Sequence, residues 1–331
     1  MKTTIIAEAG VNHNGDIAIA KKLIEIASQA GADYVKFQSF SAEKLVVKGA
    51  AKAKYQINSS DTDETQFEML KKLELSEDDY RELVEFAKKI QMKVISTAFD
   101  IDHVLMLDSL GQDVFKIPSG EITNVPYLRS IGNLQKEVVL SSGMSTIPEI
   151  KNAIDILVKE GTSSSKITVL HCTSAYPAPY SDINLRAMKT IREQLNTEVG
   201  YSDHSLGIEV AIAAVALGAS IIEKHFTLDK NLAGPDHKAS LNPQELTQMI
   251  LAIRNVESSL GSDEKRVTES ERENIKVVRK SIVAKRSIRI GEMLSEDNIT
   301  TKRPGTGLSP LLWDQIIGKA SERNYEEDDL I

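Results

Sequence analysis

The sequence predicts a (β/α)8 barrel followed by a small β-rich module. Through the first 260 residues, short apolar runs alternate with amphipathic helical patterns, and the alternation occurs eight times, which is typical of such barrels. A doubly wound open sheet is the alternative arrangement for alternating strands and helices. After Leu260 the chain becomes highly charged and then breaks into short apolar pieces separated by turns. We therefore divide it into a barrel at residues 1–262, a linker at 263–279 and a terminal module at 280–331.

The predicted strands are eight apolar runs of four to six residues, and most of them begin about 20–30 residues apart. They lie at residues 4–9, 34–38, 94–97, 114–117, 138–141, 167–171, 198–201 and 221–225. Helical patterns, in which apolar residues recur every three to four positions, separate these strands. Clear examples lie at residues 17–27, 81–90, 149–159 and 208–217.

One connection is much longer than the others and lies between the second and third strands. Its first part, residues 41–65, is polar and lysine-rich and contains the run Asn58-Ser59-Ser60-Asp61. Barrels of this kind carry their active sites on the loops that follow the strands. We interpret residues 41–65 as an insertion in such a loop.

The terminal module is rich in turn signals and short apolar pieces, as at 281–284, 288–291 and 303–307, which favours β-structure. A module of about 50 residues buries little apolar surface by itself. We expect it to pack on the barrel or on a second subunit. The charged linker at 263–279 is expected to be partly helical.

Composition excludes several functional classes. The 331 residues have a net charge of −8 and 41% hydrophobic residues, which is typical of a globular protein and argues against a nucleic-acid or anionic-membrane binder. The single cysteine, Cys172, excludes an intrachain disulfide and a multi-cysteine metal site. No apolar run reaches the roughly 18 residues of a membrane span, and the first residues lack a signal-peptide pattern. We expect a cytoplasmic enzyme.

Polar side chains gather where the predicted strands end, which is where barrel enzymes carry catalytic residues. These residues are Glu8, Lys36, Gln38, Thr97, Lys116, Ser141, His171, Ser202, Asp203, His204 and His225. Because alternate strand residues share a face, Lys36 and Gln38 should point together, as should Glu223 and His225. Two lysines meeting at the barrel mouth would imply a bound anion. The alternative is that each lysine pairs with a nearby acid such as Glu8 or Glu121.

A turn at residues 141–146 leads into a predicted helix. Thr146 and Glu149 have the spacing of a capping box, which places the helix start near Ile147. A Ser/Gly turn before a helix is either an anion site or a simple cap. The chain has no P-loop and no strand-linked G-x-G-x-x-G motif, so neither ATP nor NAD is indicated.

His204 and His225 follow neighbouring predicted strands and could hold a metal with two imidazoles. The chain has no H-E-x-x-H motif, which disfavours a zinc peptidase. With carboxylate and water completing the ligand set, an Mn²⁺-like ion is more natural than structural zinc.

Several of these segments, in fixed order, resemble the motifs of the sialic acid (N-acetylneuraminate) synthase family, which includes legionaminate and pseudaminate synthases. The matching segments are IAEAGVNHNG at 6–15, FKIPSGE at 115–121, HCTSAYP at 171–177, GYSDH at 200–204, EKHF at 223–226 and GPDH at 234–237. The terminal module, with Lys302-Arg303-Pro304-Gly305, resembles an antifreeze-like (SAF) domain. The resemblance covers almost the whole chain.

The resemblance implies condensation of phosphoenolpyruvate with an N-acetylated mannosamine-type sugar, giving a nine-carbon 2-keto acid and phosphate through C–O cleavage. The acceptor is N-acetylmannosamine or 2,4-diacetamido-2,4,6-trideoxymannose, and the product is correspondingly N-acetylneuraminate or N,N'-diacetyllegionaminate. Ser174 and residues 306–309 differ from some sialic acid synthases and leave this choice open. The resemblance also implies Mn²⁺, with Mg²⁺ or Co²⁺ as alternatives, at His204 and His225, and a domain-swapped homodimer.

The family's binding residues carry over by position. Phosphoenolpyruvate would meet Lys36, Thr97, Lys116, Ser119, Ser141 and Ser202. The sugar would meet Gln38, Tyr176, Asp236 and, from the partner chain, Arg303. Glu121 is our candidate for deprotonating the attacking water, and Glu8 for handling the sugar hydroxyl.

Three other functions remain as alternatives. Another phosphoenolpyruvate-dependent 3-deoxy-ulosonate synthase would share the chemistry but would usually lack the terminal module. A metal-dependent hydrolase would be indifferent to phosphoenolpyruvate. An ice-binding protein would need a flat threonine-rich face, and residues 280–331 are too charged for that.

Overall fold

The computed structural model describes residues 2–52 and 64–331, and the chain divides into two compact units, Met1–Gly261 and Ser262–Ile331. The run predicted at 58–61 lies outside the described residues. Within the described ranges, no helix is long and apolar enough to cross a membrane.

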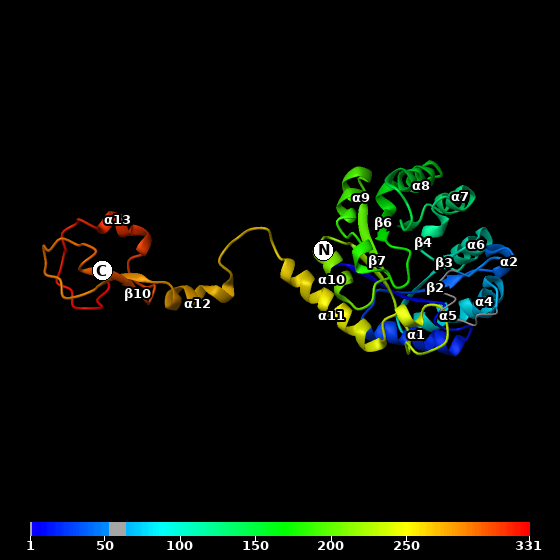
Figure 1. The fold of residues 1–331 in the computed structure, drawn as a ribbon, viewed down its shortest axis with the longest axis horizontal. Helices are drawn as coiled ribbons and strands as arrows, with labels where there is room; N and C mark the ends of the chain where they lie inside the picture. Colours follow the sequence, from blue (N-terminus) through cyan, green and yellow to red (C-terminus); the bar gives the residue numbers. More distant parts are fainter. Residues whose placement is uncertain (1, 53–63) are drawn as a thin grey trace. The chain divides into compact units, whose positions relative to one another are not determined.

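The first unit is built on a parallel sheet of eight strands, as the alternation predicted (Figure 1). Hydrogen-bonded neighbours follow the order β3-β2-β1-β8-β7-β6-β5-β4, and β3 also contacts β4, so that the sheet curls into a barrel. The open doubly wound alternative is therefore excluded. The strands are β1 (Thr4–Gly10), β2 (Tyr34–Ser39), β3 (Lys93–Ala98), β4 (Val114–Ile117), β5 (Glu137–Ser141), β6 (Ile167–Cys172), β7 (Glu198–Asp203) and β8 (Ile221–His225).

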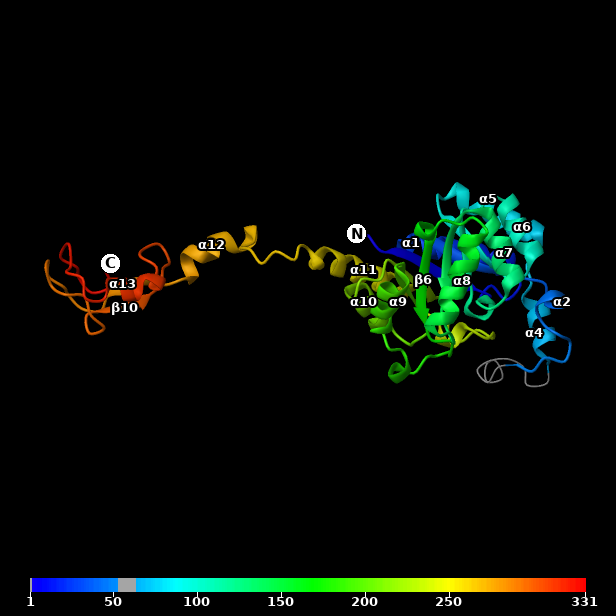
Figure 2. The ribbon, with the colours of Figure 1, turned by 90° about the horizontal axis from the view of Figure 1, so that it is seen from above.

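Helices surround the strands in the first unit (Figures 1 and 2). They are α1 (Ile17–Ala30), α5 (Glu77–Lys89), α6 (Ile101–Ser109), α7 (Val125–Leu134), α8 (Ile147–Lys159), α9 (Ala187–Leu195), α10 (Glu209–Ala216) and α11 (Pro243–Leu260). The capping box predicted for α8 is confirmed, because the Glu149 carboxylate accepts hydrogen bonds from the amide and hydroxyl of Thr146. The same reciprocal cap, Thr or Ser with Glu or Asp, starts α5 at Ser76 and Asp79.

Strand parity separates the core from the barrel interior. On β2, Val35 and Phe37 are fully buried in the cluster that includes Leu23 of α1. The residues between and after them, Lys36 and Gln38, face a cavity at the carboxyl ends of the strands. The hydrophobic side of each strand therefore packs on the helices, and the polar side is free to build a site.

The described part of the predicted insertion, residues 41–65, includes the short helix α2 (Ala42–Leu45). Helix α4 (Gln66–Leu73) follows the insertion and lies against α2 (Figure 2). A separate apolar cluster holds them to the barrel. Its buried members are Val11, Phe40, Met69 and Leu73. Helices α2 and α4 are thus packed parts of the barrel's upper face.

The second unit contains α12 (Glu269–Val278), the antiparallel pair β9 (Ser281–Ala284) and β10 (Ile299–Lys302), and α13 (Trp313–Ile316). Helix α12 lies within the stretch expected to be a partly helical linker. The unit has its own small core around Ile282, Ile288 and Ile299, as a β-rich module requires.

Candidate active site

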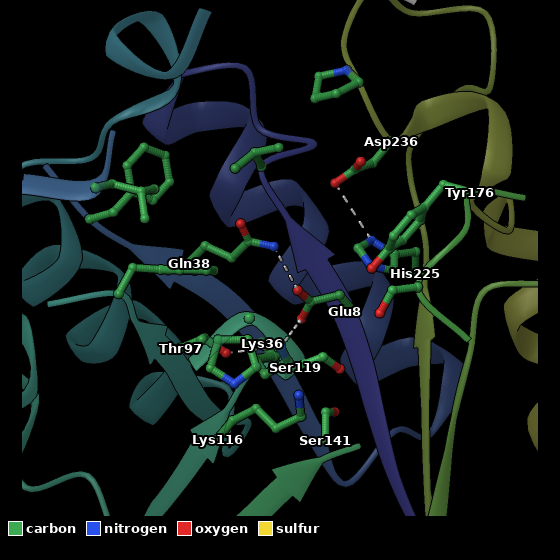
Figure 3. A pocket seen from close by; sticks show the side chains of 18 of the residues that line it. Glu8, Lys36, Gln38, Thr97, Lys116, Ser119, Ser141, Tyr176, His225 and Asp236 are labelled. Carbon is green, nitrogen blue, oxygen red and sulfur yellow. Dashed lines mark hydrogen bonds and ion pairs between the residues drawn. The ribbon is translucent and has the colours of Figure 1, made fainter. Parts of the chain in front are cut away.

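A cavity of about 460 Å³ opens at the carboxyl ends of the barrel strands. Most of the predicted site residues line it together (Figure 3). They are Glu8, Lys36, Gln38, Thr97, Lys116, Ser119, Ser141, Tyr176, Ser202, His204, His225 and, from the loop after β8, Asp236. Two predicted site residues, Glu121 and Arg303, do not line it.

The bottom of the cavity holds four buried charged groups, Glu8, Lys36, Lys116 and Glu223, which we call the inner cluster. Lys36 Nζ lies 3.0 Å from Glu8 Oε2 and 3.4 Å from Glu223 Oε2, and Lys116 Nζ lies 3.5 Å from Glu223 Oε1. The barrel register creates the cluster, because Glu8 of β1 is paired with Lys36 of β2 on one side and His225 of β8 on the other. The sequence left open whether the two lysines bind an anion or pair with a nearby acid. For Lys36 the pairing with Glu8 is confirmed, and Glu223 is its second partner.

The inner cluster is poorly satisfied by the protein itself. Lys36 Nζ donates a hydrogen bond to Thr97 Oγ1 at 3.0 Å, and Gln38 Nε2 donates to Glu8 Oε1 at 3.2 Å. Within the described part of the chain, Glu8 Oε2, Glu223 Oε2 and Ser141 Oγ take part in no hydrogen bond despite their burial. Buried polar atoms are normally hydrogen-bonded, so these atoms indicate a place that a polar ligand fills.

Burial and charge divide the two carboxylates of the inner cluster. Burial raises the pKa of Glu8 to about 7, against the opposing attraction of Lys36. Burial would also raise the pKa of Glu223, but Lys116 and Lys36 outweigh it and hold that pKa at about 2. Two carboxylates with pKa values driven apart by their environments are typical of acid–base sites. Glu223 stays ionised, and Glu8 exchanges a proton near neutral pH.

Hydroxyl and amide groups surround the inner cluster. Ser202 Oγ donates to Glu223 Oε1 at 3.0 Å, and the amide of Gly143 donates to Ser119 Oγ at 2.9 Å. Ser141 Oγ remains buried and unbonded among the described residues. Serine and threonine hydroxyls next to buried lysines form a set of donors suited to phosphate or carboxylate.

The two predicted metal ligands lie close together above the inner cluster, with ring centroids of His204 and His225 5.7 Å apart. His204 Nδ1 donates to the carbonyl of Thr173 at 2.7 Å, which leaves Nε2 as the acceptor toward Tyr176 Oη at 3.0 Å. Burial lowers the pKa of His204 to about 4 and that of His225 well below its usual range. Both imidazoles are therefore neutral, as metal coordination requires.

The donor set fits a metal held by two imidazoles rather than a complete protein cage. His225 Nδ1 is buried without a hydrogen bond from the described residues, and it lies 3.9 Å from Asp236 Oδ2. Burial raises the pKa of Asp236 to about 6. Among residues 2–52 and 64–331 there is no group of three or more His, Cys, Asp or Glu side chains arranged for a metal, so water and substrate would supply the remaining ligands.

A second buried ion pair lies behind the histidines, on the opposite face of the same strands. Lys224 Nζ contacts Asp203 Oδ2 at 2.8 Å and donates to the carbonyl of Ser205 at 2.5 Å. Asp203 Oδ1 accepts from the amide and the hydroxyl of Ser205, at 2.9 and 2.6 Å. This outer pair, Asp203 and Lys224, ties β7 to β8 directly beside His204 and His225.

The loop that carries Asp236 is held by the loop after β1. Asn12 Nδ2 donates to the carbonyl of Phe226 at 2.8 Å and to Ser240 Oγ at 3.0 Å. Ser240 Oγ in turn donates to the carbonyl of Asp236 at 2.7 Å. The chain of bonds fixes the position of Asp236 over the cavity.

Glu121 points away from the cavity lining, and Arg303 belongs to the second unit. Glu121 ends the short 3-10 helix Ser119–Glu121 and accepts a hydrogen bond from Asn124 Nδ2 at 2.6 Å. Arg303 is exposed in the second unit and donates to the carbonyl of Val278 at 3.0 Å. His171, which also ends a strand, bonds the carbonyl of Ile183 and lines a different hollow.

Sequence reasoning missed Glu223 as a site residue. The signal was available, because Glu223 precedes His225 by two positions on one strand and therefore shares its face. It also missed the apolar residues that the insertion adds to the cavity, for which the chain offers no periodic signal.

Comparison with known proteins places the chain among sugar-acid synthases. The sequence pattern of the NeuB family matches residues 23–265, and that of the SAF domain matches residues 279–331. The N,N'-diacetyllegionaminic acid synthase of Campylobacter jejuni is 52% identical, with 100% of this chain and 99% of the relative covered. The enzyme of the same name from Legionella pneumophila is 46% identical over 98% of this chain and 92% of its own.

A solved structure supports the same grouping. The crystal structure of N-acetylneuraminic acid synthetase from Leptospira borgpetersenii, in complex with citrate, is 32% identical and superposes with a TM-score of 0.72. The match covers 83% of this chain and 90% of that one.

Proposed function

The chain belongs to the NeuB family, and from this premise we propose that it is an N,N'-diacetyllegionaminic acid synthase. Enzymes of this class are nonulosonic acid synthases, which condense phosphoenolpyruvate with an N-acetylated amino sugar. For this chain the proposed acceptor is 2,4-diacetamido-2,4,6-trideoxymannose. Likeness along the whole chain to two N,N'-diacetyllegionaminic acid synthases supports that choice.

The inner cluster is the observation that carries the proposal. Phosphoenolpyruvate bears a phosphate and a carboxylate, and the cavity presents two buried lysines, Lys36 and Lys116, beside the hydroxyls of Ser119, Ser141 and Ser202. Charge-assisted hydrogen bonds of this kind are roughly twice as strong as neutral ones. Ser141 Oγ, which has no hydrogen bond among the described residues, is free to donate to the substrate, and Glu8 Oε2 and Glu223 Oε2, which meet Lys36 as ion pairs without a counted hydrogen bond, can accept from water or a sugar hydroxyl.

The reaction joins C3 of phosphoenolpyruvate to the aldehyde carbon of the open-chain sugar. Water adds at C2, and the tetrahedral intermediate breaks the C2–O bond to release inorganic phosphate. Water loses two protons as its oxygen becomes the C2 ketone. One of them balances the proton that the aldehyde oxygen gains as it becomes a hydroxyl, and the other leaves on the phosphate, which departs as hydrogen phosphate. Atoms therefore balance to one nine-carbon 2-keto acid and one phosphate.

Glu8 is the proposed source of the proton for the aldehyde oxygen. Its pKa of about 7 makes it an efficient acid at neutral pH, and Gln38 holds its side chain toward the cavity through the 3.2 Å hydrogen bond. Glu223 remains ionised between the two lysines. It offsets their charge, so that the anionic substrate is bound without being held too tightly for release.

His204 and His225 are the proposed metal ligands, and Mn²⁺ is the proposed ion. A divalent metal at this position supplies a Lewis acid that polarises the sugar's aldehyde oxygen. The hydrogen bond from His204 Nδ1 to Thr173 fixes the tautomer with its free lone pair on Nε2. Tyr176 and Asp236, beside the histidines, are the proposed sugar contacts on that side.

Three further predictions complete the proposal. The enzyme forms a homodimer, Arg303 of one chain reaches the sugar bound by the other, and the protein acts in the cytoplasm. The resemblance to the family supports the first two, and the described lining residues contain no arginine that would take the place of Arg303.

Phosphate release tests the function directly. Purified enzyme with Mn²⁺ and phosphoenolpyruvate should release phosphate with 2,4-diacetamido-2,4,6-trideoxymannose, more slowly with N-acetylmannosamine, and not with N-acetylmannosamine 6-phosphate. Treatment with a chelator should abolish release, and added Mn²⁺ should restore it. Release with none of the acceptors would refute the proposed function, and activity that survives the chelator would refute the metal role of the two histidines.

A further inference from the structure

One side of the cavity is apolar. Four half-buried side chains, Leu45, Val46, Leu70 and Phe99, form this apolar wall. Buried Phe40, Met69 and Leu73 also line the cavity and pack with them in one apolar cluster, and the rings of Phe40 and Phe99 meet edge to face at 6.1 Å.

The wall lies one layer farther out than the inner cluster. Along β2 and its exit, Lys36, Gln38 and Phe40 follow one another on the same face and all line the cavity. At roughly 3.3 Å per residue, Phe40 lies about 13 Å beyond Lys36. The end of β3 has the same order, because Thr97 is followed two residues later by Phe99, as Gln38 is followed by Phe40.

The opposite side of the cavity is polar, since Tyr176, His225 and Asp236 gather there (Figure 3). On the wall side, Gln66 lines the cavity one turn before Leu70 on α4, and it contributes an amide but no charge. Among the described residues that line the cavity, the lysines are Lys36 and Lys116, both in the inner cluster, and none stands beside the wall. A hydroxyl or phosphate placed against the four apolar side chains would lose its water, and no charged side chain among the described lining residues stands there to replace it.

We propose that the apolar wall selects an acceptor sugar that ends in a C6 methyl group and carries a second N-acetyl group, and that it rejects sugars with a C6 hydroxyl or phosphate. The inference rests on the proposed function. The sugar reacts at C1, beside the inner cluster, so its C4 to C6 end extends toward the mouth. There the C6 methyl and the methyl of the 4-acetamido group bury apolar surface on the wall, which stabilises the complex.

The test compares three acceptors with phosphoenolpyruvate and Mn²⁺. They are 2,4-diacetamido-2,4,6-trideoxymannose, 2-acetamido-2,6-dideoxymannose and N-acetylmannosamine. The wild-type kcat/KM should decrease in that order, because each step removes one apolar contact. Discrimination by one methyl group in an apolar pocket is typically about tenfold or more.

Two variants of the apolar wall and one matched control test whether the preference for the first acceptor arises at the wall. Leu70→Gln should reduce the kcat/KM ratio of the first acceptor to the third by about tenfold, and Val46→Thr, which keeps the side-chain shape, should reduce it by a smaller factor. The neighbouring Val47 is 78% exposed and does not line the cavity, so Val47→Thr should leave the ratio unchanged. Thermal melts of all three variants verify folding.

Three outcomes would overturn the proposal. If the wild type prefers N-acetylmannosamine, the synthase activity stands and the selectivity assigned to the wall is refuted. If folded Leu70→Gln and Val46→Thr both keep the wild-type ratio, selection arises elsewhere in the cavity. If the wild type releases phosphate with none of the three sugars, the proposed function and the inference both fail.

Discussion

Two groups of buried charges lie back to back on the same strands and have opposite properties. The inner cluster faces into the barrel, and Glu8 Oε2 and Glu223 Oε2 meet Lys36 only as ion pairs, without a hydrogen bond among the described residues. The neighbouring Ser141 Oγ has no hydrogen bond among these residues either. The outer pair, Asp203 and Lys224, is fully enclosed, and its charged atoms form short hydrogen bonds with each other and with Ser205. Strands β7 and β8 supply both groups. Ser202 of β7 pairs with Glu223 of β8 beside the inner cluster, and the next pair along the strands, Asp203 with Lys224, is the outer pair.

The number of hydrogen bonds that the protein itself provides distinguishes a binding site from a structural ion pair when both consist of buried charges. Burying an ion costs several kcal/mol unless partners replace its hydration. The outer pair replaces that hydration within the protein, so it needs no ligand. The inner cluster does so only in part, since Glu8 Oε2, Glu223 Oε2 and Ser141 Oγ form no hydrogen bond with the described residues, as suits a cavity that binds a polar ligand.

The largest expected effect is on catalysis, from Glu8→Gln. The amide keeps the shape and the contact with Gln38 but cannot donate the proton, so turnover should fall by about 10²- to 10⁴-fold while the protein remains folded. Because the acid form of Glu8 is the active one, wild-type kcat/KM should decline above about pH 7, where this group loses its proton. That alkaline limb should be absent from the variant.

Glu121→Gln is the matched control, since it changes another carboxylate near the cavity that does not line it. Its turnover should stay within a fewfold of wild type, with an unchanged pH profile. If instead Glu121→Gln loses as much turnover as Glu8→Gln, Glu121 takes part in catalysis, as its first assignment to deprotonating the attacking water predicts. If Glu8→Gln keeps both its turnover and its alkaline limb, Glu8 has no role in proton transfer.

The next effect is on stability, from Lys224→Met. The change leaves the Asp203 carboxylate buried without its partner, and such a break costs about 3–5 kcal/mol in the free energy of unfolding. Because the pair ties the strands beside His204 and His225, Mn²⁺ affinity should also fall, by about 10- to 100-fold as for other groups that orient metal ligands. Urea unfolding and calorimetric titration with Mn²⁺ measure the two quantities.

A double variant that removes both charges distinguishes two effects. One is the unfolding free energy lost when a buried charge has no partner, and the other is the loss of the bonds that position His204 and His225. Asp203→Leu with Lys224→Met replaces the pair by apolar groups, a change that is often neutral or stabilising, so most of the lost stability should return. Mn²⁺ affinity should remain low, because the bonds from Asp203 to the amide and hydroxyl of Ser205 are still missing. Recovery of full affinity in the double variant would show that the outer pair has no part in positioning the histidines.

Much of this arrangement follows from strand periodicity. The positions of the eight strands, together with the parity of Lys36 with Gln38 and of Glu223 with His225, are enough to predict which faces line the cavity. The same parity would have found the outer pair, because Asp203 and Lys224 alternate with inward-facing neighbours. The capping box likewise predicts the start of α8 at Ile147.

Periodicity ends where the strands end, and the remaining features depend on tertiary packing. Glu121 follows β4 in a short 3-10 turn that directs it to Asn124, and no strand rule predicts that orientation. The apolar wall combines the exits of β2 and β3 with two helices of an insertion. Which residues of such a loop face the cavity depends on contacts among segments far apart in the chain.

The smallest expected effects come from two serines three residues apart, and they compare the two charge groups directly. One serine bonds the inner cluster and the other bonds the outer pair. Ser202 Oγ donates to Glu223 at 3.0 Å, and Ser205 Oγ donates to Asp203 at 2.6 Å. A hydrogen bond to a charged group is worth about 1.5–3 kcal/mol. Ser202 also lines the cavity, so Ser202→Ala should raise KM for phosphoenolpyruvate by about tenfold in addition to lowering the unfolding free energy by about 1.5 kcal/mol. Ser205→Ala should lower the unfolding free energy by about 1.5 kcal/mol and leave KM unchanged, and similar profiles for both would remove the functional distinction between the two charge groups.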